Sequence, residues 1–340
     1  MRRPTVVAIG GNSLIRAGQR GGIEEQRANA LITARAIAEL VQCGHTIVMT
    51  HGNGPQVGAH LLRSEIAADQ VYPEPLDVCG ANTQGAIGYI LEQALIHAFA
   101  DAGVSAPVAT VLTQVVIDPA DPAFQNPTKP VGPFYTAEQA RQYAREKGWT
   151  VVEDAARGWR RVVPSPEPRE IVEIDAIRQL VTSGYVVIAA GGGGIPVVRR
   201  DGELVGIEAV IDKDLAAALL ACLLRARLLV ISTDVEYVYL HYRERDEMPL
   251  KHVRAATLRR YAAGGHFPPG NMGPKIEAAL RFLAHGGREV IITSPEMLTE
   301  AVAGRAGTHI VAERSSQRCR RRSCGRRRDQ RTVRSVDFFG

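Results

Sequence analysis

Short runs of β-branched residues alternate along this chain with longer stretches in which apolar residues recur at helical spacing. The run Val6–Ile9 predicts a strand, and the apolar positions of Glu24–Gln42 predict the helix that follows it. The other predicted strands are Thr46–Met49, Val108–Ile117, Tyr185–Ala190, Leu228–Ser232 and, last along the chain, Glu289–Thr293, and the other predicted helices are Pro75–Phe99, Leu215–Leu224 and Pro274–His285. Because strands and helices alternate, we expect an α/β fold with a parallel sheet and helices on both faces.

The pattern changes between residues 118 and 168, where eight prolines interrupt any regular period. Within this stretch, Val151–Val152 and Arg160–Val163 are expected to pair as a β-hairpin. A proline-rich insertion of this length is atypical of another strand and helix of the main sheet. We therefore predict a main domain over residues 1–311, with a small subdomain inserted at about 118–168.

Composition excludes several classes of protein. Apolar residues make up 45% of the chain, which is ample for a buried core. The chain contains no uninterrupted run of 18 apolar residues, so no membrane span is expected. The N-terminus lacks the long apolar region of a secretion signal, so secretion is not expected. The five cysteines show no zinc-ligand spacing, and Cys43, Cys79 and Cys222 are expected to be buried, reduced thiols. These features predict a cytoplasmic protein without a membrane partner.

The formal net charge of +5 is distributed unevenly. Residues 312–340 hold ten arginines against three acidic residues, a net charge of +7, which leaves −2 for residues 1–311. The main domain therefore lacks the charge of a nucleic-acid-binding protein. The arginine-rich tail has no helical or strand period and is predicted to be disordered. We expect no catalytic role for it; an RNA-binding or targeting arm, or a shifted reading frame, remains open as its explanation.

Three glycine-rich turns each follow a predicted strand: GGN from Gly10, HGNG from His51 and GGGG from Gly191. Glycine lets backbone N–H groups approach an anion closely, and ligands of open α/β sheets bind where the strands end. Three such turns together predict a site for phosphate or another small anion. None has the pattern of a P-loop or of a dinucleotide-binding turn. His51 is either a catalytic group or a side chain that holds the turn.

Lysines are scarce in this chain, which has 36 arginines and five lysines. Three of the five lie in unusual contexts: Lys129 in NPTKP, Lys213 in VIDKD and Lys275 in MGPKI. Lys213 is placed near the start of a predicted helix, where the helix dipole disfavours a positive charge. A compact ammonium group suits a tight phosphate site, and phosphoryl transfer depends on such charges. Asp214 could orient Lys213 through an ion pair.

Several long motifs resemble those of the carbamate kinases, which form part of the amino acid kinase superfamily. They include VLTQVVIDPADPAFQNPTKPVGPF, GWRRVVPSPEP, GIEAVIDKD and HFPPGNMGPKIEAA, and the resemblance runs in order from Val6 to Val311. It implies a three-layer αβα sandwich with a central, mainly parallel sheet and a small protruding subdomain. It also implies a homodimer. Members of the family end soon after the equivalent of Val311, so the arginine-rich tail departs from the pattern.

The resemblance implies reversible phosphoryl transfer between ATP and carbamate, giving ADP and carbamoyl phosphate, with Mg²⁺ and often in the direction of ATP. It assigns catalytic roles to Lys129, Lys213, Asp214 and Lys275. It assigns binding of carbamate and of the transferred phosphoryl group to Gly10, Gly11, Asn12, Gly52, Asn53 and Gly54. It assigns nucleotide binding to Gly191, Gly192, Gly193, Asp234, Tyr239, Met272 and Lys275.

Two other functions stay open at this point. A kinase of another small acid in the same superfamily would share most of these motifs, although the NPTKP segment argues against it. A nucleotide sensor without turnover would keep the nucleotide-binding residues, but the three intact lysines argue against that reading. A single assay of phosphoryl transfer separates all three.

Overall fold

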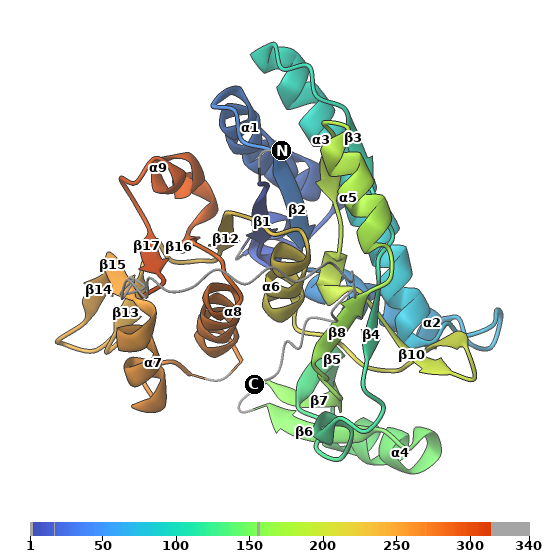
Figure 1. Ribbon diagram of the computed structural model, residues 1–340. Helices are drawn as coiled ribbons and strands as arrows, with labels where there is room; N and C mark the ends of the chain where they lie inside the picture. The colour runs from blue at the N-terminus through green and yellow to red at the C-terminus, as the bar shows by residue number, and fades with distance from the viewer. Residues whose placement is uncertain (1–2, 17, 155–156, 269, 314–340) are drawn as a thin grey trace, which may run out of the picture.

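A central eight-stranded sheet organises the computed structural model, which describes residues 3–313 apart from 17, 155–156 and 269 (Figure 1). Its strand order is β15-β17-β16-β12-β1-β2-β9-β3, and every neighbouring pair is parallel except β16 and β17. The strands are β1 Thr5–Ile9, β2 Ile47–His51, β3 Val108–Thr110, β9 Val186–Ile188, β12 Leu228–Ser232, β15 His252–Arg254, β16 Glu289–Thr293 and β17 Thr308–Val311. The predicted mainly parallel sheet is confirmed.

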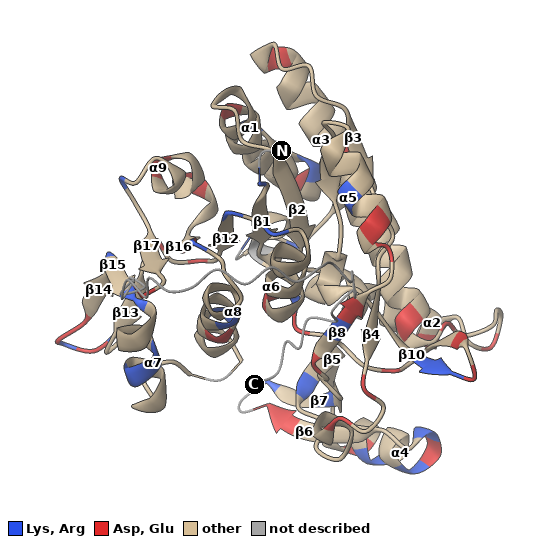
Figure 2. Ribbon diagram, in the orientation of Figure 1, with Lys and Arg blue, Asp and Glu red and all other residues tan. Residues whose placement is uncertain are grey.

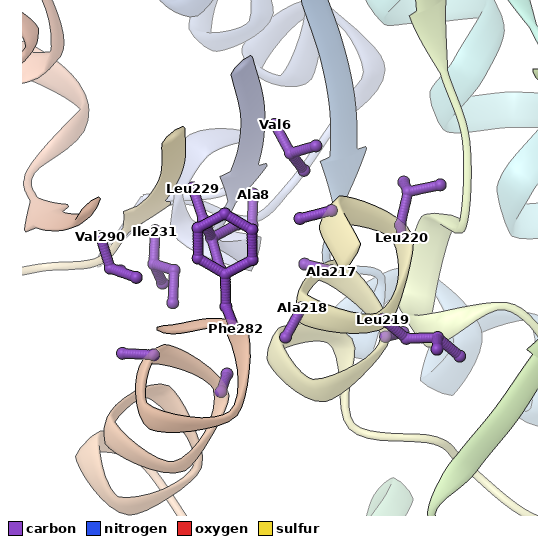
Figure 3. Close-up of a cluster of buried hydrophobic side chains, with 14 of the residues drawn as sticks. Val6, Ala8, Ala217, Ala218, Leu219, Leu220, Leu229, Ile231, Phe282 and Val290 are labelled. Atoms are coloured by element: carbon purple, nitrogen blue, oxygen red, sulfur yellow. The ribbon is translucent and has the colours of Figure 1, made fainter. Parts of the chain in front are cut away.

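Helices cover both faces of this sheet, so the predicted three-layer α/β architecture is also confirmed (Figure 1). On one face lie α1 (Ile23–Gln42) and α3 (Leu76–Ala102), and on the other lie α5 (Ile174–Thr182), α6 (Lys213–Leu223) and α8 (Met272–Ala284). Alternate residues of a strand point to opposite faces. Val7 and Ile9 accordingly pack with α1 and α3, whereas Val6 and Ala8 pack with α6 and α8. Figure 3 shows the second group around Phe282.

Smaller sheets extend from the carboxyl ends of the central strands. One has four strands in the order β11-β10-β4-β8, another has three in the order β5-β7-β6, and β13 pairs with β14. Their strands are β4 Gln114–Ile117, β5 Lys129–Tyr135, β6 Thr150–Asp154, β7 Gly158–Val163, β8 Pro168–Ile171, β10 Ile195–Arg200, β11 Glu203–Gly206, β13 Val238–Leu240 and β14 Met248–Leu250. The remaining α-helices of the described residues are α2 Gly54–Ile66, α4 Ala137–Lys147, α7 Ala255–Ala263 and α9 Leu298–Val302.

The hairpin predicted within the proline-rich insertion is confirmed, because β6 and β7 pair antiparallel with Val152 opposite Arg160. Sequence analysis did not predict α4, which precedes this hairpin. Its start carries a recognisable signal, since Thr136 and Gln139 form a capping box in which each side chain accepts a hydrogen bond from the other residue's backbone N–H. The boundaries of the inserted subdomain stay a prediction.

The prediction of one strand over Val108–Ile117 is wrong. The chain leaves the central sheet after β3 and joins the four-stranded sheet as β4. The side chain of Gln84, from α3, takes the place of a neighbouring strand at the break. Its carbonyl oxygen accepts from the Thr113 N–H at 2.8 Å, and its amide donates to the Thr113 carbonyl at 3.1 Å. A partner 29 residues away therefore decides where the strand is divided.

Two further expectations need correction. The strand Glu289–Thr293 is not the last, because β17 follows it and returns antiparallel beside it. Cys79 is buried, but Cys43 is exposed, since it lies just past the end of α1. Residues 314–340, which make up nearly all of the predicted tail, lie outside the described residues. Among those described, no helix is long and apolar enough to cross a membrane.

Candidate active site

Two of the glycine turns emerge side by side because their strands are neighbours. Ile9, at the end of β1, is in register with His51, at the end of β2. A Cβ atom on Gly52 would lie 3.0 Å from the Gly11 backbone nitrogen, so any larger residue would crowd the two turns at this approach. The turn that contains Gly192 packs on the same place. Gly192 has a φ of +67°, and a Cβ atom there would lie 2.3 Å from the Asn53 side chain.

The turns border a cavity of about 640 Å³ that also receives the N-terminal ends of α6 and α8 and the start of β5. The predicted site residues that line it are Gly11, Gly52, Asn53, Gly54, Lys129, Gly192, Lys213, Asp214 and Lys275. Those that do not are Gly10, Gly191, Gly193, Asp234, Tyr239 and Met272, and the Asn12 side chain is not among those described. Residues from six separate parts of the chain thus meet in one hollow.

Asp214 is the centre of the charged groups in this cavity. The Lys213 ammonium donates to Asp214 Oδ1 at 2.6 Å, and the Lys275 ammonium donates to Asp214 Oδ2 at 3.1 Å. The ion pair expected between Lys213 and Asp214 is therefore present. Only 2% of Asp214 and 7% of Lys275 is exposed, so these charges interact with little solvent screening. Asp214 holds two lysines from different helices at one point.

Asp212 links Lys129, the third lysine, to the start of α6, where Lys213 and Asp214 lie. It is the N-cap of α6, where its Oδ1 accepts from the backbone N–H of Asp214 at 2.9 Å. Its other oxygen, Oδ2, accepts from the Lys129 ammonium at 2.9 Å, and Lys129 is the first residue of β5. Asp212 was not among the predicted site residues. Its position before an apolar helical run signalled the cap, but nothing local signalled Lys129.

The charges that line the cavity favour an anion. Burial pushes the pKa of Asp214 upward, but the ammonium groups of Lys213 and Lys275 outweigh it and hold the pKa below its usual value. By formal charge, the lining residues Lys129, Lys213, Lys275 and Arg160 exceed Asp212 and Asp214 by two positive charges. Arg160 is a further residue that sequence analysis missed. It comes from β7 and donates to the Gly132 carbonyl at 3.0 Å, while its buried Nε has no described partner.

The sequence pattern that defines the amino acid kinase family matches residues 3–294. The chain belongs to the amino acid kinase family. Among its relatives, the carbamate kinase of Thermococcus kodakarensis is 52% identical over 91% of this chain and 99% of its own length. The "carbamate kinase-like protein YahI" of Escherichia coli is 50% identical over 92% and 99%. The solved structure of carbamate kinase from Giardia lamblia bound to AMP-PNP has a TM-score of 0.87 and 42% identity, with 92% and 99% of the two chains covered.

His51 has a structural position in this amino acid kinase. Its ring is buried beneath Gly191, and burial lowers its pKa to about 4. The neutral ring donates from Nδ1 to the Gly52 carbonyl at 3.1 Å. Of the two interpretations left open for His51, this geometry favours the one in which the side chain holds the glycine turn.

The residues predicted to bind nucleotide fall into two groups in this kinase. Gly192 and Lys275 line the cavity. Asp234, which follows β12, is exposed, and Tyr239 lies in β13 with its ring centre 5.7 Å from that of Tyr242. A nucleotide that contacts both groups would extend from the cavity past α8. The nucleotide-binding role of both groups stays a prediction.

Proposed function

We propose that this protein is a carbamate kinase, which transfers a phosphoryl group between ATP and carbamate and gives ADP and carbamoyl phosphate. One observation carries the proposal: Lys129, Lys213 and Lys275 converge on two aspartates beside the glycine turns. The curated relatives named carbamate kinase, which match over nearly their whole length, support the same acceptor.

The reaction does not require the protein to act as a general acid or base. Carbamate is already an anion, so its oxygen attacks the terminal phosphorus without losing a proton. The new P–O bond forms while the bond to the ADP oxygen breaks, and the electron pair leaves with ADP. The main barrier is the approach of two anions, which preorganised positive charges and N–H groups lower. A cavity whose carboxylates are both paired with lysines suits such a step.

The three lysines have distinct positions in this mechanism. Lys213 would neutralise the transferred phosphoryl group, and Asp214 fixes its ammonium group together with that of Lys275. Lys275 would contact the phosphates of the nucleotide. Lys129 would reach the reacting groups from β5, steadied by Asp212. The backbone N–H groups of the turns at Gly11 and Gly52–Gly54 would bind carbamate and the phosphoryl group between them, with Gly10 and Asn12 part of the first turn.

The lining of the cavity is compatible with the implied Mg²⁺ if the ion enters bound to the nucleotide. Asp212 and Asp214 are the only carboxylates among the described residues that line the cavity, and each already binds a lysine. Mg²⁺ keeps several waters and readily binds phosphate oxygens, so the ATP or ADP phosphates would hold it here. When bound, the ion would neutralise part of the charge of the phosphate groups, and the lysines would neutralise the remainder.

The inserted segment at about 118–168 would act as a subdomain that covers the acceptor site. It contributes both Lys129 and Arg160 to the cavity. Two polar contacts support its attachment to the main domain: Arg161 Nη2 donates to Glu208 at 2.6 Å, and the Tyr135 hydroxyl donates to Glu65 at 3.1 Å. For the nucleotide we propose the loop Gly191–Gly193 together with Asp234, Tyr239 and Met272.

The resemblance to carbamate kinases also supports proposals on the cellular setting. We infer a cytoplasmic homodimer that makes ATP from carbamoyl phosphate. The described surface offers one candidate for the dimer contact. Tyr89 and Ile96 are seven residues apart on α3, hence on one helical face, and expose 55% and 52% of their surface.

The deciding experiment measures ATP formation from ADP, Mg²⁺ and carbamoyl phosphate, with acetyl phosphate as the comparison. We expect rapid turnover with carbamoyl phosphate and little with acetyl phosphate. Preference for another acyl phosphate would identify a kinase of a different small acid. Nucleotide binding without any turnover would identify a sensor and overturn the proposed roles of the lysines.

A further inference from the structure

Three arginines gather at the edge of the central sheet opposite to the candidate active site. Arg227 immediately precedes β12, Arg288 immediately precedes β16, and Arg3 lies two residues before β1. These strands are neighbours that start in register, with Leu228 opposite both Thr5 and Glu289. The glycine turns lie at the other ends of such strands. A five-residue strand spans about 17 Å, so the two places are well separated.

The arginines border a hollow of about 820 Å³, together with Cys43 and His45. Its one acidic lining residue, Glu289, is already engaged, because its Oε1 lies 2.7 Å from His309 Nδ1. Within the described part of the chain, no carboxylate forms an ion pair with Arg3, Arg227 or Arg288. All three are exposed on this hollow. By contrast, the buried Arg161 and the half-buried Arg281 each form an ion pair with a glutamate.

A multiply charged anion matches this arrangement. Three guanidinium groups that form no ion pair with a described carboxylate repel one another, and a ligand with a single charge would leave most of that repulsion. Guanidinium groups bind phosphate oxygens in bidentate fashion, and the hollow has the volume usual for small-molecule sites. The positive charge of Arg227 acts on a neighbouring group in the hollow, since burial and the charge of Arg227 both lower the pKa of His45. Figure 2 shows basic segments at this edge, near the N-terminus.

We propose that this hollow is a second ligand site, which binds a small molecule carrying two or more phosphate groups. The site is distinct from the one proposed for phosphoryl transfer, since it uses the opposite edge of the sheet and none of the same residues. Its occupancy can be read without any enzymatic assay, because the exposed thiol of Cys43 lies in its wall.

The test follows alkylation of Cys43 in the full-length protein by iodoacetamide, a neutral reagent, with the Cys43 peptide quantified by mass spectrometry. Inorganic tripolyphosphate is the probe, and sodium sulfate at equal ionic strength is the comparison. At ten times its dissociation constant, tripolyphosphate should slow alkylation about tenfold, because only the unoccupied fraction reacts. Sulfate should leave the rate nearly unchanged. Absence of saturable protection, or equal protection by sulfate, would overturn the proposal.

Arginine variants test whether the protection of Cys43 from alkylation depends on Arg3, Arg227 and Arg288. The double variant Arg227→Gln/Arg288→Gln should lose it, whereas Arg141→Gln/Arg259→Gln, which removes the same charge from exposed positions on α4 and α7, should keep it. If the double variant folds poorly, the single variant Arg3→Gln, which changes a residue before the first strand, can replace it and should also lose protection. Protection that survives in the Arg227→Gln/Arg288→Gln or Arg3→Gln variants would contradict the assignment. Turnover of carbamoyl phosphate in each variant reports on folding.

Discussion

At the scale of single residues, the choice between lysine and arginine carries much of the argument. The chain uses 36 arginines and five lysines, and three of those lysines meet in one cavity. One of them, Lys213, packs closely on Gly52, because a Cβ atom on Gly52 would lie 3.3 Å from Lys213 Cδ. A flat guanidinium group needs more room than an ammonium group and binds in a fixed plane. The compact ammonium group of lysine therefore suits a tight phosphate site better than a guanidinium group does.

Lys213→Ala should lower kcat for ATP formation by about two to three orders of magnitude, the usual cost of removing one preorganised charge from a transition state. Lys251→Ala, at an exposed position, serves as the matched control and should keep full turnover. Thermal unfolding of both variants checks that the fold persists. Unchanged kcat in a folded Lys213→Ala variant would remove Lys213 from the mechanism.

His51 should make the stability of the protein depend on pH. Burial lowers its pKa to about 4, below the ordinary value of 6.5, so between these values the unfolded chain binds more protons than the folded one. The free energy of unfolding should therefore fall as the pH drops from 6.5 towards 4, by about 3 kcal/mol from this group. Urea unfolding across that range measures the slope. His51→Asn should flatten it, and equal slopes in the two proteins would contradict the assignment.

At the scale of an element, the start of α6 combines two roles in one side chain. Asp212 caps the helix with Oδ1 and binds Lys129 with Oδ2. Capping belongs to local structure, whereas the bond to Lys129 connects α6 to β5. Substitutions that preserve one role and remove the other can separate them.

Asp212→Asn should retain the cap and lose the ion pair, because asparagine caps helices about as well as aspartate. Asp212→Ala should lose both and lower the free energy of unfolding by about 1 kcal/mol. We expect reduced turnover in both variants but reduced stability only in the alanine variant. Chemical unfolding and steady-state kinetics on the same preparations test this. Full activity in Asp212→Asn would show that Lys129 does not depend on the pair.

At the scale of the whole molecule, the sheet separates two charged regions. Parallel strands place all their carboxyl ends at one edge, where the glycine turns and lysines collect, and all their starts at the other, where Arg3, Arg227 and Arg288 collect. The strand order thus creates both the candidate active site and the second proposed site from residues that are far apart in sequence.

The proposed homodimer makes a prediction at this scale. Light scattering should give a mass of twice the 36.8 kDa of the chain. Ile96→Glu should shift the mass towards that of a single chain, since a charge in the exposed apolar face of α3 opposes its burial against a partner. Ile66→Glu, at an exposed position at the end of α2, is the comparison and should leave the mass unchanged. A wild-type mass of one chain would contradict the dimer.

Local patterns in the sequence determined the order and type of most elements. The period of apolar residues located β1, α1, β12, α6 and α8 to within a few residues, because that period depends on neighbours along the chain. The glycine turns and the unusual contexts of Lys129, Lys213 and Lys275 also indicated a phosphate site. The long motifs indicated the family, which the comparisons confirm.

Only the tertiary structure decided which side chains meet. Lys129 and Asp212 are 83 residues apart, and Lys275 and Asp214 are 61 apart, so no local pattern predicts their ion pairs. Arg160 reaches the cavity, and Gln84 divides a predicted strand, for the same reason. Such contacts depend on the order of strands and on the packing of helices across the sheet. Those are set by the burial of the whole apolar core rather than by any single segment.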